Sequence, residues 1–304
     1  MRRGFTLTDL VAGVAVTGVL GALAVTVALA EPSGNTERLF QSLANLRAIG
    51  EATGAYRADN RGYLPLETTT SRRRPNILQS DVSGWCTWQY GGKNSSASWY
   101  QSYGGSFDVE AADRPLNPYL YPGYTFIAPT PPARLPANDP ARTSQEARVF
   151  RDPADVNGHQ RSWPNPNNPV TSSYNDVGTS YLAQMAWWEQ ISRQFGGLSF
   201  TQQYNLGTAR LASDQGVDPS RFVHVLDDVG DIVSVYTDPN LHMTGNYGGI
   251  NQGVSIFDDG QAGLVTFPTG GTRATSVRPE YSVWFEDLPR PGAEQLGGAG
   301  AVMK

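Results

Sequence analysis

The apolar run near the N-terminus constrains this chain more than any other part of its sequence. From Phe5 to Ala30 the residues read FTLTDLVAGVAVTGVLGALAVTVALA, and Asp9 carries the one charged side chain among them. A helix needs about 20 apolar residues to cross the hydrocarbon core of a bilayer, so this run can span a membrane. Arg2 and Arg3 precede it, and the next basic residue is Arg38. By the positive-inside rule we expect the N-terminus in the cytoplasm and the rest of the chain outside.

Two simple interpretations of this run compete with a more specialised one. The first is a cleaved secretory signal peptide, because Ala28-Leu29-Ala30 before Glu31 has the small-x-small cleavage pattern. The second is an uncut membrane anchor. Neither provides a partner for Asp9, although a carboxylate at the centre of a membrane helix costs about 2.5–3.5 kcal/mol and is normally retained for one.

The residues around the start of the run resemble a known family. Gly4-Phe5-Thr6-Leu7-Thr8-Asp9, directly after a very short basic leader, is similar to the signature of type IV prepilins and pseudopilins. The resemblance implies cleavage after Gly4 by prepilin peptidase and methylation of the new N-terminus at Phe5. It also implies that Asp9, where the family usually has Glu, pairs with the N-terminus of a neighbouring subunit during assembly. An ion pair of this kind sets register better than it adds stability.

The same resemblance implies a division of the chain and a fold. Residues 1–4 are the leader, 5–30 the transmembrane and assembly helix, 31–62 an amphipathic helix, and 63–304 an extracytoplasmic globular domain. Apolar residues from Leu39 to Ile49 recur at helical spacing, and the stretch NLRAIGEATGAYRADNRGYLP resembles large prepilin-like proteins. We therefore expect an α+β, pilin-like fold in which the long N-terminal helix packs on a C-terminal antiparallel sheet with long loop insertions.

Later elements follow from local patterns. Apolar spacing predicts a helix over residues 180–195, and Asp258-Asp259-Gly260 is typical of a hairpin turn. Alternation of apolar and polar residues, together with short runs of strand-forming residues, predicts strands over residues 221–226, 231–236, 253–257, 263–267 and 281–285.

Two further stretches resemble the long prepilin-like proteins. Residues 148–155, RVFRDPAD, followed by Ser172-Ser173-Tyr174, are similar to their Phe-x-Cys-Pro-x-Asp and Ser-Tyr motif, with Asp152 where Cys is usual. His242 followed by residues 253–260, GVSIFDDG, is similar to their C-terminal histidine to aspartate-glycine motif.

Composition narrows the class of protein and of partner. The net charge is −5 with a pI near 5.2, so no broad basic face is offered to nucleic acid. The 33 glycines and 21 prolines favour long loops and short strands. Cys86 is the single cysteine, which rules out an intramolecular disulfide and favours a small buried side chain.

The sequence predicts no catalytic residues and no enzyme activity. The histidines, His159, His224 and His242, lack paired metal spacing, and no nucleophile or phosphate-loop motif is present. Acids in the C-terminal third form a candidate structural calcium site, because calcium takes six to eight oxygen ligands. The alternative is that they are solvated turn acids. These residues are Asp227, Asp228, Asp231, Asp238, Asp258 and Asp259.

Aromatic residues gather between positions 85 and 103, interleaved with Gly, Ser and Asn. Exposed, Trp85, Trp88 and Trp99 would form a binding surface for a glycan or a protein. Buried, they would form core in a region poor in aliphatic residues, which is the alternative that we favour.

The function that these observations predict is that of a structural subunit of a type IV pilus or type II secretion pseudopilus. Its expected partners are prepilin peptidase, other pilin or pseudopilin subunits, the inner-membrane assembly platform and membrane lipid, without nucleic acid. It would cross the cytoplasmic membrane once, with the globular domain in the periplasm or outside the cell. The alternative is a membrane-anchored or secreted binding module that does not polymerise.

Overall fold

The computed structural model describes residues 34–66, 86–101, 109–127, 139–235, 238, 240–267 and 281–289. The chain divides into two compact units, Met1–Glu37 and Arg38–Lys304, and nearly all of the described residues belong to the second. The described residues of this second unit form helices and a four-stranded antiparallel sheet, so its fold is α+β.

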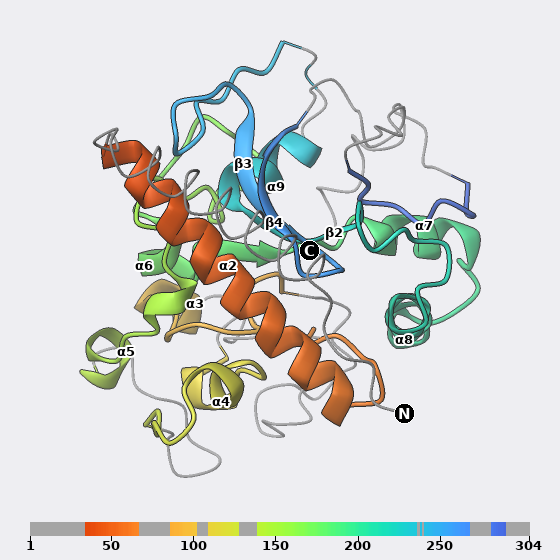
Figure 1. The fold of residues 1–304 in the computed structure, drawn as a ribbon, viewed down its shortest axis with the longest axis horizontal. Helices are drawn as coiled ribbons and strands as arrows, with labels where there is room; N and C mark the ends of the chain where they lie inside the picture. Colours follow the sequence, from red (N-terminus) through yellow and green to blue (C-terminus); the bar gives the residue numbers. More distant parts are fainter. Residues whose placement is uncertain are drawn as a thin grey trace, which may run out of the picture. The chain divides into compact units, whose positions relative to one another are not determined.

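The predicted amphipathic helix is present as α2, Gly34–Asp59, drawn in orange in Figure 1. Its buried positions recur every three or four residues and lie on one face. The helix ends where the chain turns left-handed, with φ of 58° at Arg61 and 82° at Gly62. There the Gly62 N–H donates to the Arg57 carbonyl (2.8 Å), a usual way to satisfy a terminal carbonyl. The buried residues of α2 are Ser42, Asn45, Leu46, Ile49, Ala52 and Thr53.

The sheet has four antiparallel strands in the order β1-β2-β3-β4: Tyr181–Ala183, Val223–Asp227, Gln252–Phe257 and Ala262–Thr266. β3 and β4 form a hairpin in which Gln252 lies opposite Thr266 and Ile256 opposite Ala262. Gly260 supplies the positive φ of 87° that the turn requires, as Asp258-Asp259-Gly260 predicts. Three of the predicted strands, those beginning at residues 221, 253 and 263, are therefore confirmed.

Helices cover both faces of this sheet (Figure 1). Side chains alternate between faces along a strand, so Val225 and Ile256 pack with Leu46 and Ile49 of α2. Burial of each of these α2 side chains contributes about 1.5–3 kcal/mol. On the opposite face, Leu226 packs in a second cluster with α9, Asp228–Val235. The sheet is thus the middle layer between α2 and α9.

A third cluster lies beside the sheet, where α7, Trp187–Gln194, contacts α8, Phe200–Ala212. The Trp187 ring packs 6.2 Å from that of Phe285, centroid to centroid. Ser199 caps α8 in a reciprocal box with Gln202, which satisfies two N–H groups at the helix start. The other helices in the described ranges are short: α3 (Ala97–Gln101), η3 (Ala111–Asp113), α4 (Asn117–Leu120), α5 (Ala141–Ser144), η4 (Arg148–Phe150) and α6 (Ser173–Val177).

Three local predictions are wrong. Residues 231–236 were expected as a strand, but residues 228–235 form α9, whose start is capped by the Asp227 carboxylate accepting from the Gly230 N–H (2.9 Å). The helix expected over 180–195 begins only at Trp187, because residues 181–183 form β1. Residues 281–285 make a single parallel bridge, Phe222 to Ser282, and form no strand.

The loop-rich part around α3, α4 and α6 is held by a buried cation. Arg114 is fully buried and donates to the carbonyls of Val109, Trp88, Gly91 and Val177 over distances of 2.8–3.2 Å. These carbonyls belong to three separate segments of the chain, at residues 88–91, 109 and 177. One guanidinium, which offers five N–H donors, therefore holds together segments whose backbones are not paired as strands.

Candidate functional site

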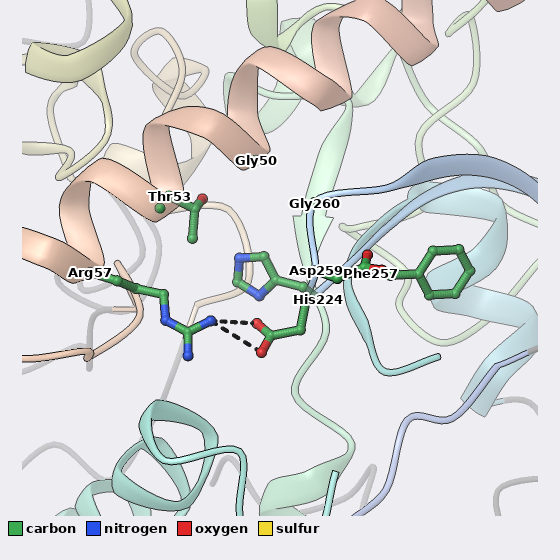
Figure 2. A pocket seen from close by; sticks show the side chains of 9 residues that line it. Gly50, Thr53, Arg57, His224, Phe257, Asp259 and Gly260 are labelled. Carbon is green, nitrogen blue, oxygen red and sulfur yellow. Dashed lines mark hydrogen bonds and ion pairs between the residues drawn. The ribbon is translucent and has the colours of Figure 1, made fainter. Parts of the chain in front are cut away.

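A small pocket of about 120 Å³ lies where α2 meets the β3–β4 hairpin (Figure 2). Thr53 and Arg57 face it from α2, one turn apart, and Gly50 and Gly54 open the helix surface beside them. His224 enters from β2, and the hairpin turn closes the far side. The lining residues are Gly50, Thr53, Gly54, Arg57, His224, Phe257, Asp258, Asp259 and Gly260.

An ion pair forms one wall of the pocket. Arg57 Nη1 donates to both carboxylate oxygens of Asp258, at 3.0 and 3.1 Å, and Nη2 donates to the Leu211 carbonyl at 3.1 Å. The Asp258 side chain is only 2% exposed, against 20% for Arg57. A charge pair this buried costs desolvation and needs good geometry, so it fixes how α2 sits on the hairpin more than it adds stability.

His224 points into the space between Thr53 and this ion pair (Figure 2). Burial lowers its pKa to about 4, Asp258 opposes that shift and Arg57 adds to it, so the imidazole is neutral near pH 7. Its Nε2 atom is buried and has no hydrogen-bond partner. The Thr53 hydroxyl already donates to the Ile49 carbonyl (2.8 Å). Chemically, the lining can hold a small polar group, and it contains no serine, cysteine or lysine nucleophile.

The predicted calcium ligands fall into two sets, one at the start of α9 and one in turns, and all of them bind protein groups. Asp227 is fully buried and accepts from the N–H groups of Gly230 and Val254, and burial raises its pKa well above the usual range. Asp228 accepts from His159 Nδ1 at 2.6 Å. Asp231 accepts from the side-chain amide of Gln160 (3.2 Å). These three acids form one group near the start of α9.

The other three predicted ligands lie in turns. Asp238 is exposed and accepts from the Asn240 N–H (2.8 Å), and Asp259 accepts from the Gln261 N–H (2.9 Å). Asp258 is paired with Arg57, as above. Within the described part of the chain, no group of three or more His, Cys, Asp or Glu residues is placed to hold a metal ion. Structural calcium stays a prediction.

The two tryptophans that the structure describes in the aromatic segment are buried. Trp88 is 7% and Trp99 9% exposed, and their ring centroids lie 4.9 Å apart. They belong to the same hydrophobic cluster as Leu226 and Cys86. Both indoles therefore lie in the hydrophobic core, as in the favoured alternative, and do not form an exposed binding surface. Trp85 lies outside the described residues.

The N-terminal residues on which the family resemblance depends, Gly4, Phe5 and Asp9, also lie outside the described residues. Among the helices that are described, none combines the length and the apolar character needed to cross a bilayer.

One pair of stretches that resembles the prepilin-like proteins does come together. Asp155, from the RVFRDPAD stretch, accepts from the N–H groups of Ser173 and Tyr174 and from the Ser180 hydroxyl (2.6 Å). Burial raises the Asp155 pKa to about 6, against the effect of these donors. Asp152, in the position of the usual Cys, accepts from the Tyr247 hydroxyl at 2.6 Å. These hydrogen bonds therefore connect the segment after η4 to the start of α6 and to the residue before β1.

Sequence reasoning missed the pocket itself. Arg57, His224 and Asp258 lie in three elements, and only the hairpin position of Asp258 has a local signal, the Asp-Asp-Gly turn. Long-range pairing of one arginine with one aspartate leaves no such signal in a single sequence.

No family model, curated protein or solved structure matches the chain.

Proposed function

We propose that this chain is a pilin-like structural subunit, cleaved after Gly4 and assembled through its N-terminal helix into a type IV pilus or a type II secretion pseudopilus. The observation that carries the proposal is the sequence at 4–9, GFTLTD, which opens the apolar run from Phe5 to Ala30, a run long enough to span a membrane. Its acid, Asp9, needs a partner in such a run, and the N-terminus of a neighbouring subunit would provide one.

The arrangement of the second unit supports this proposal. A long helix, α2, lies across a sheet whose strands are all antiparallel, and its apolar face is buried there. A pilin-like plan requires such a helix, continuing from the apolar run into the globular domain. The ion pair between Arg57 and Asp258 attaches the end of α2 to the hairpin, so force applied along the helix would reach the sheet.

The proposed setting follows from the same features. The basic leader keeps the N-terminus in the cytoplasm, the apolar run crosses the cytoplasmic membrane once, and the globular domain lies outside it. The partners are then prepilin peptidase, the assembly platform, membrane lipid and other subunits.

The mature N-terminus tests processing. Mass spectrometry of the protein isolated from its native membrane should find a chain that begins at N-methylated Phe5. A chain that begins at Glu31 would make it a secreted domain, and an intact Met1 would make it a simple anchor; either result would refute the proposal.

Asp9→Ala tests assembly, with Asp9→Glu as the matched control. We expect the alanine variant to be processed but to lose incorporation into sedimentable filaments, because it lacks the buried charge. The glutamate variant should assemble at least as well as the wild type. If both variants and the wild type remain unassembled in the native host, the non-polymerising binding module is the better description.

A further inference from the structure

Lys93 stands out chemically among the cations of this protein. Of the 23 lysines and arginines, only Lys93 and the C-terminal Lys304 are lysines. An arginine stays protonated in proteins, whereas a lysine amine can lose its proton when it is buried and can then act as a nucleophile. Position 93 is thus the one internal position that offers an amine.

The amine lies against an amide and a carboxylate. Lys93 Nζ is 3.1 Å from Asn175 Oδ1 and 3.3 Å from Glu146 Oε1. The Lys93 side chain is 9% exposed, and its Nζ lies 4.2 Å from the centre of the Tyr174 ring. The amine therefore contacts both a carboxamide and a carboxylate that can act as a general base, and these are the three groups that amide exchange requires.

Backbone and side-chain hydrogen bonds hold the three groups in place. The Lys93 N–H donates to the Gly178 carbonyl (2.9 Å), just beyond the end of α6. Asn175 lies within α6, whose start is capped by Ser172. The Tyr174 hydroxyl donates to Glu146 Oε2 (2.8 Å) and orients its carboxylate.

We propose that Lys93 and Asn175 become joined by an intramolecular amide bond, with Glu146 as the proton carrier. The neutral Nζ attacks Cγ of Asn175, and Glu146 accepts the proton that Nζ gives up. As Cγ–Nζ forms, Cγ–Nδ2 breaks, and Glu146 passes the proton to Nδ2, which leaves as ammonia. The atoms balance without an oxidant, a reductant or a cofactor.

The surroundings favour this chemistry. Burial lowers the pKa of Lys93 from its usual value, Glu146 opposes the shift, and nearby Arg151 adds to it, so a larger fraction of the amine is neutral. Glu146 and Asn175 are exposed on their other sides, which gives ammonia a route to solvent. The bond would connect positions 82 residues apart in a chain whose single cysteine cannot form an internal disulfide. It would restrict the unfolded chain in the same way as a disulfide does.

Because Lys93 is the only internal lysine, a lysine-specific protease reports on the bond directly. The denatured full-length protein should resist cleavage after residue 93, and its mass should be lower by about 17 Da, the mass of one ammonia. A digest with a second protease should give a branched peptide that contains residues 93 and 175. Cleavage into two fragments at Lys93, with the full mass, would overturn the proposal.

Matched variants separate this reaction from other losses of ammonia. Asn175→Ala should restore cleavage after Lys93, and Glu146→Gln, which keeps the shape but cannot accept the proton, should do the same. A cyclic imide at Asn175 would also lower the mass, but it would leave Lys93 cleavable in the wild type, which counts against the amide bond. If Glu146→Gln stays fully resistant to the protease, Glu146 is not the proton carrier. The inference does not rest on the proposed filament function.

Discussion

Burial shifts the proton affinities of Asp155 and His224 in opposite directions. The pKa of Asp155 rises from 3.8 to about 6 because its carboxylate is desolvated beside Ser173 and Ser180. The pKa of His224 falls from 6.5 to about 4 because the pocket desolvates its imidazolium. Both shifts favour the neutral form, as a low-dielectric interior does, so His224 is neutral near pH 7, whereas Asp155 is neutral only below about pH 6.

These shifts predict opposite pH dependences of stability. Between about pH 4 and 6 the folded state holds the Asp155 proton more tightly than the unfolded state, so this residue lowers the free energy of unfolding as pH rises. His224 raises the free energy of unfolding over nearly the same window, because there the unfolded state binds the proton more tightly. Shifts of about 2 to 2.5 pKa units correspond to at most about 3–3.5 kcal/mol each.

Urea unfolding of two variants measures both effects. Relative to the wild type, Asp155→Asn should make the free energy of unfolding rise more steeply between pH 4 and 6, and His224→Leu should make it rise less steeply. The comparison of slopes cancels the titration of the remaining acids. Profiles of both variants that run parallel to the wild type would show that neither residue has a shifted pKa.

At the scale of elements, two glycines one turn apart on α2 have opposite surroundings. A methyl group added at Gly50 would lie 2.4 Å from Ile256 Cδ1 in β3, whereas at Gly54 it would meet nothing within 4 Å. Ile256 is fully buried, so its side chain has little room to move. Gly50 is therefore what allows α2 to approach the sheet so closely.

Alanine at these two positions tests that approach. Gly50→Ala should destabilise the protein by about 1–3 kcal/mol through overpacking, although alanine is the better helix former. Gly54→Ala should stabilise it by about 0.5–1 kcal/mol, since only helix propensity changes. The free energies of unfolding in urea give both values. Equal stabilisation by the two substitutions would place α2 farther from β3 than the structure has it.

The elements that sequence predicts are those with a clear period or turn signal. α2 has apolar residues at helical spacing from Leu39 to Ile49, and the hairpin has Asp-Asp-Gly between two alternating strands. α9 and β1 lie in the interior, and periodicity cannot separate a helix from a strand where every face is buried. For α9, the cap at Asp227 is the feature that favours a helix after β2. A local signal also exists for α8, whose Ser-x-x-Gln capping box predicts a helix start at Ser199.

For the whole molecule, α2 is the part of the N-terminal region on which the second unit depends. It inserts Leu46 and Ile49 into the core, and Ser42 shares a hydrogen bond with Tyr181 of β1 (2.8 Å). Loss of these contacts would remove a large part of a stability that typically totals 5–15 kcal/mol. The apolar spacing predicts that this face of α2 is buried. It does not predict which residues α2 meets at the pocket, because His224 and Asp258 are distant from α2 in the sequence.

Truncation tests this dependence. A chain that begins at Gly34 keeps all of α2 and should unfold in one cooperative urea transition as a soluble protein. A chain that begins at Gly50 lacks the first four turns of α2, and we expect it to lose that transition in circular dichroism and to aggregate during size exclusion. An unchanged unfolding midpoint for the shorter chain would show that α2 packs only weakly on the sheet.

The buried Arg114 has a consequence for how this protein can vary among related sequences. Its guanidinium holds backbone carbonyls, and every residue type supplies a carbonyl. The loops that it connects can therefore change their side chains without losing their path, as long as Arg114 and the two glycines beside its guanidinium, Gly92 and Gly178, remain. Evolution could redesign the outer surface of these loops for new neighbours while the scaffold beneath them stays the same.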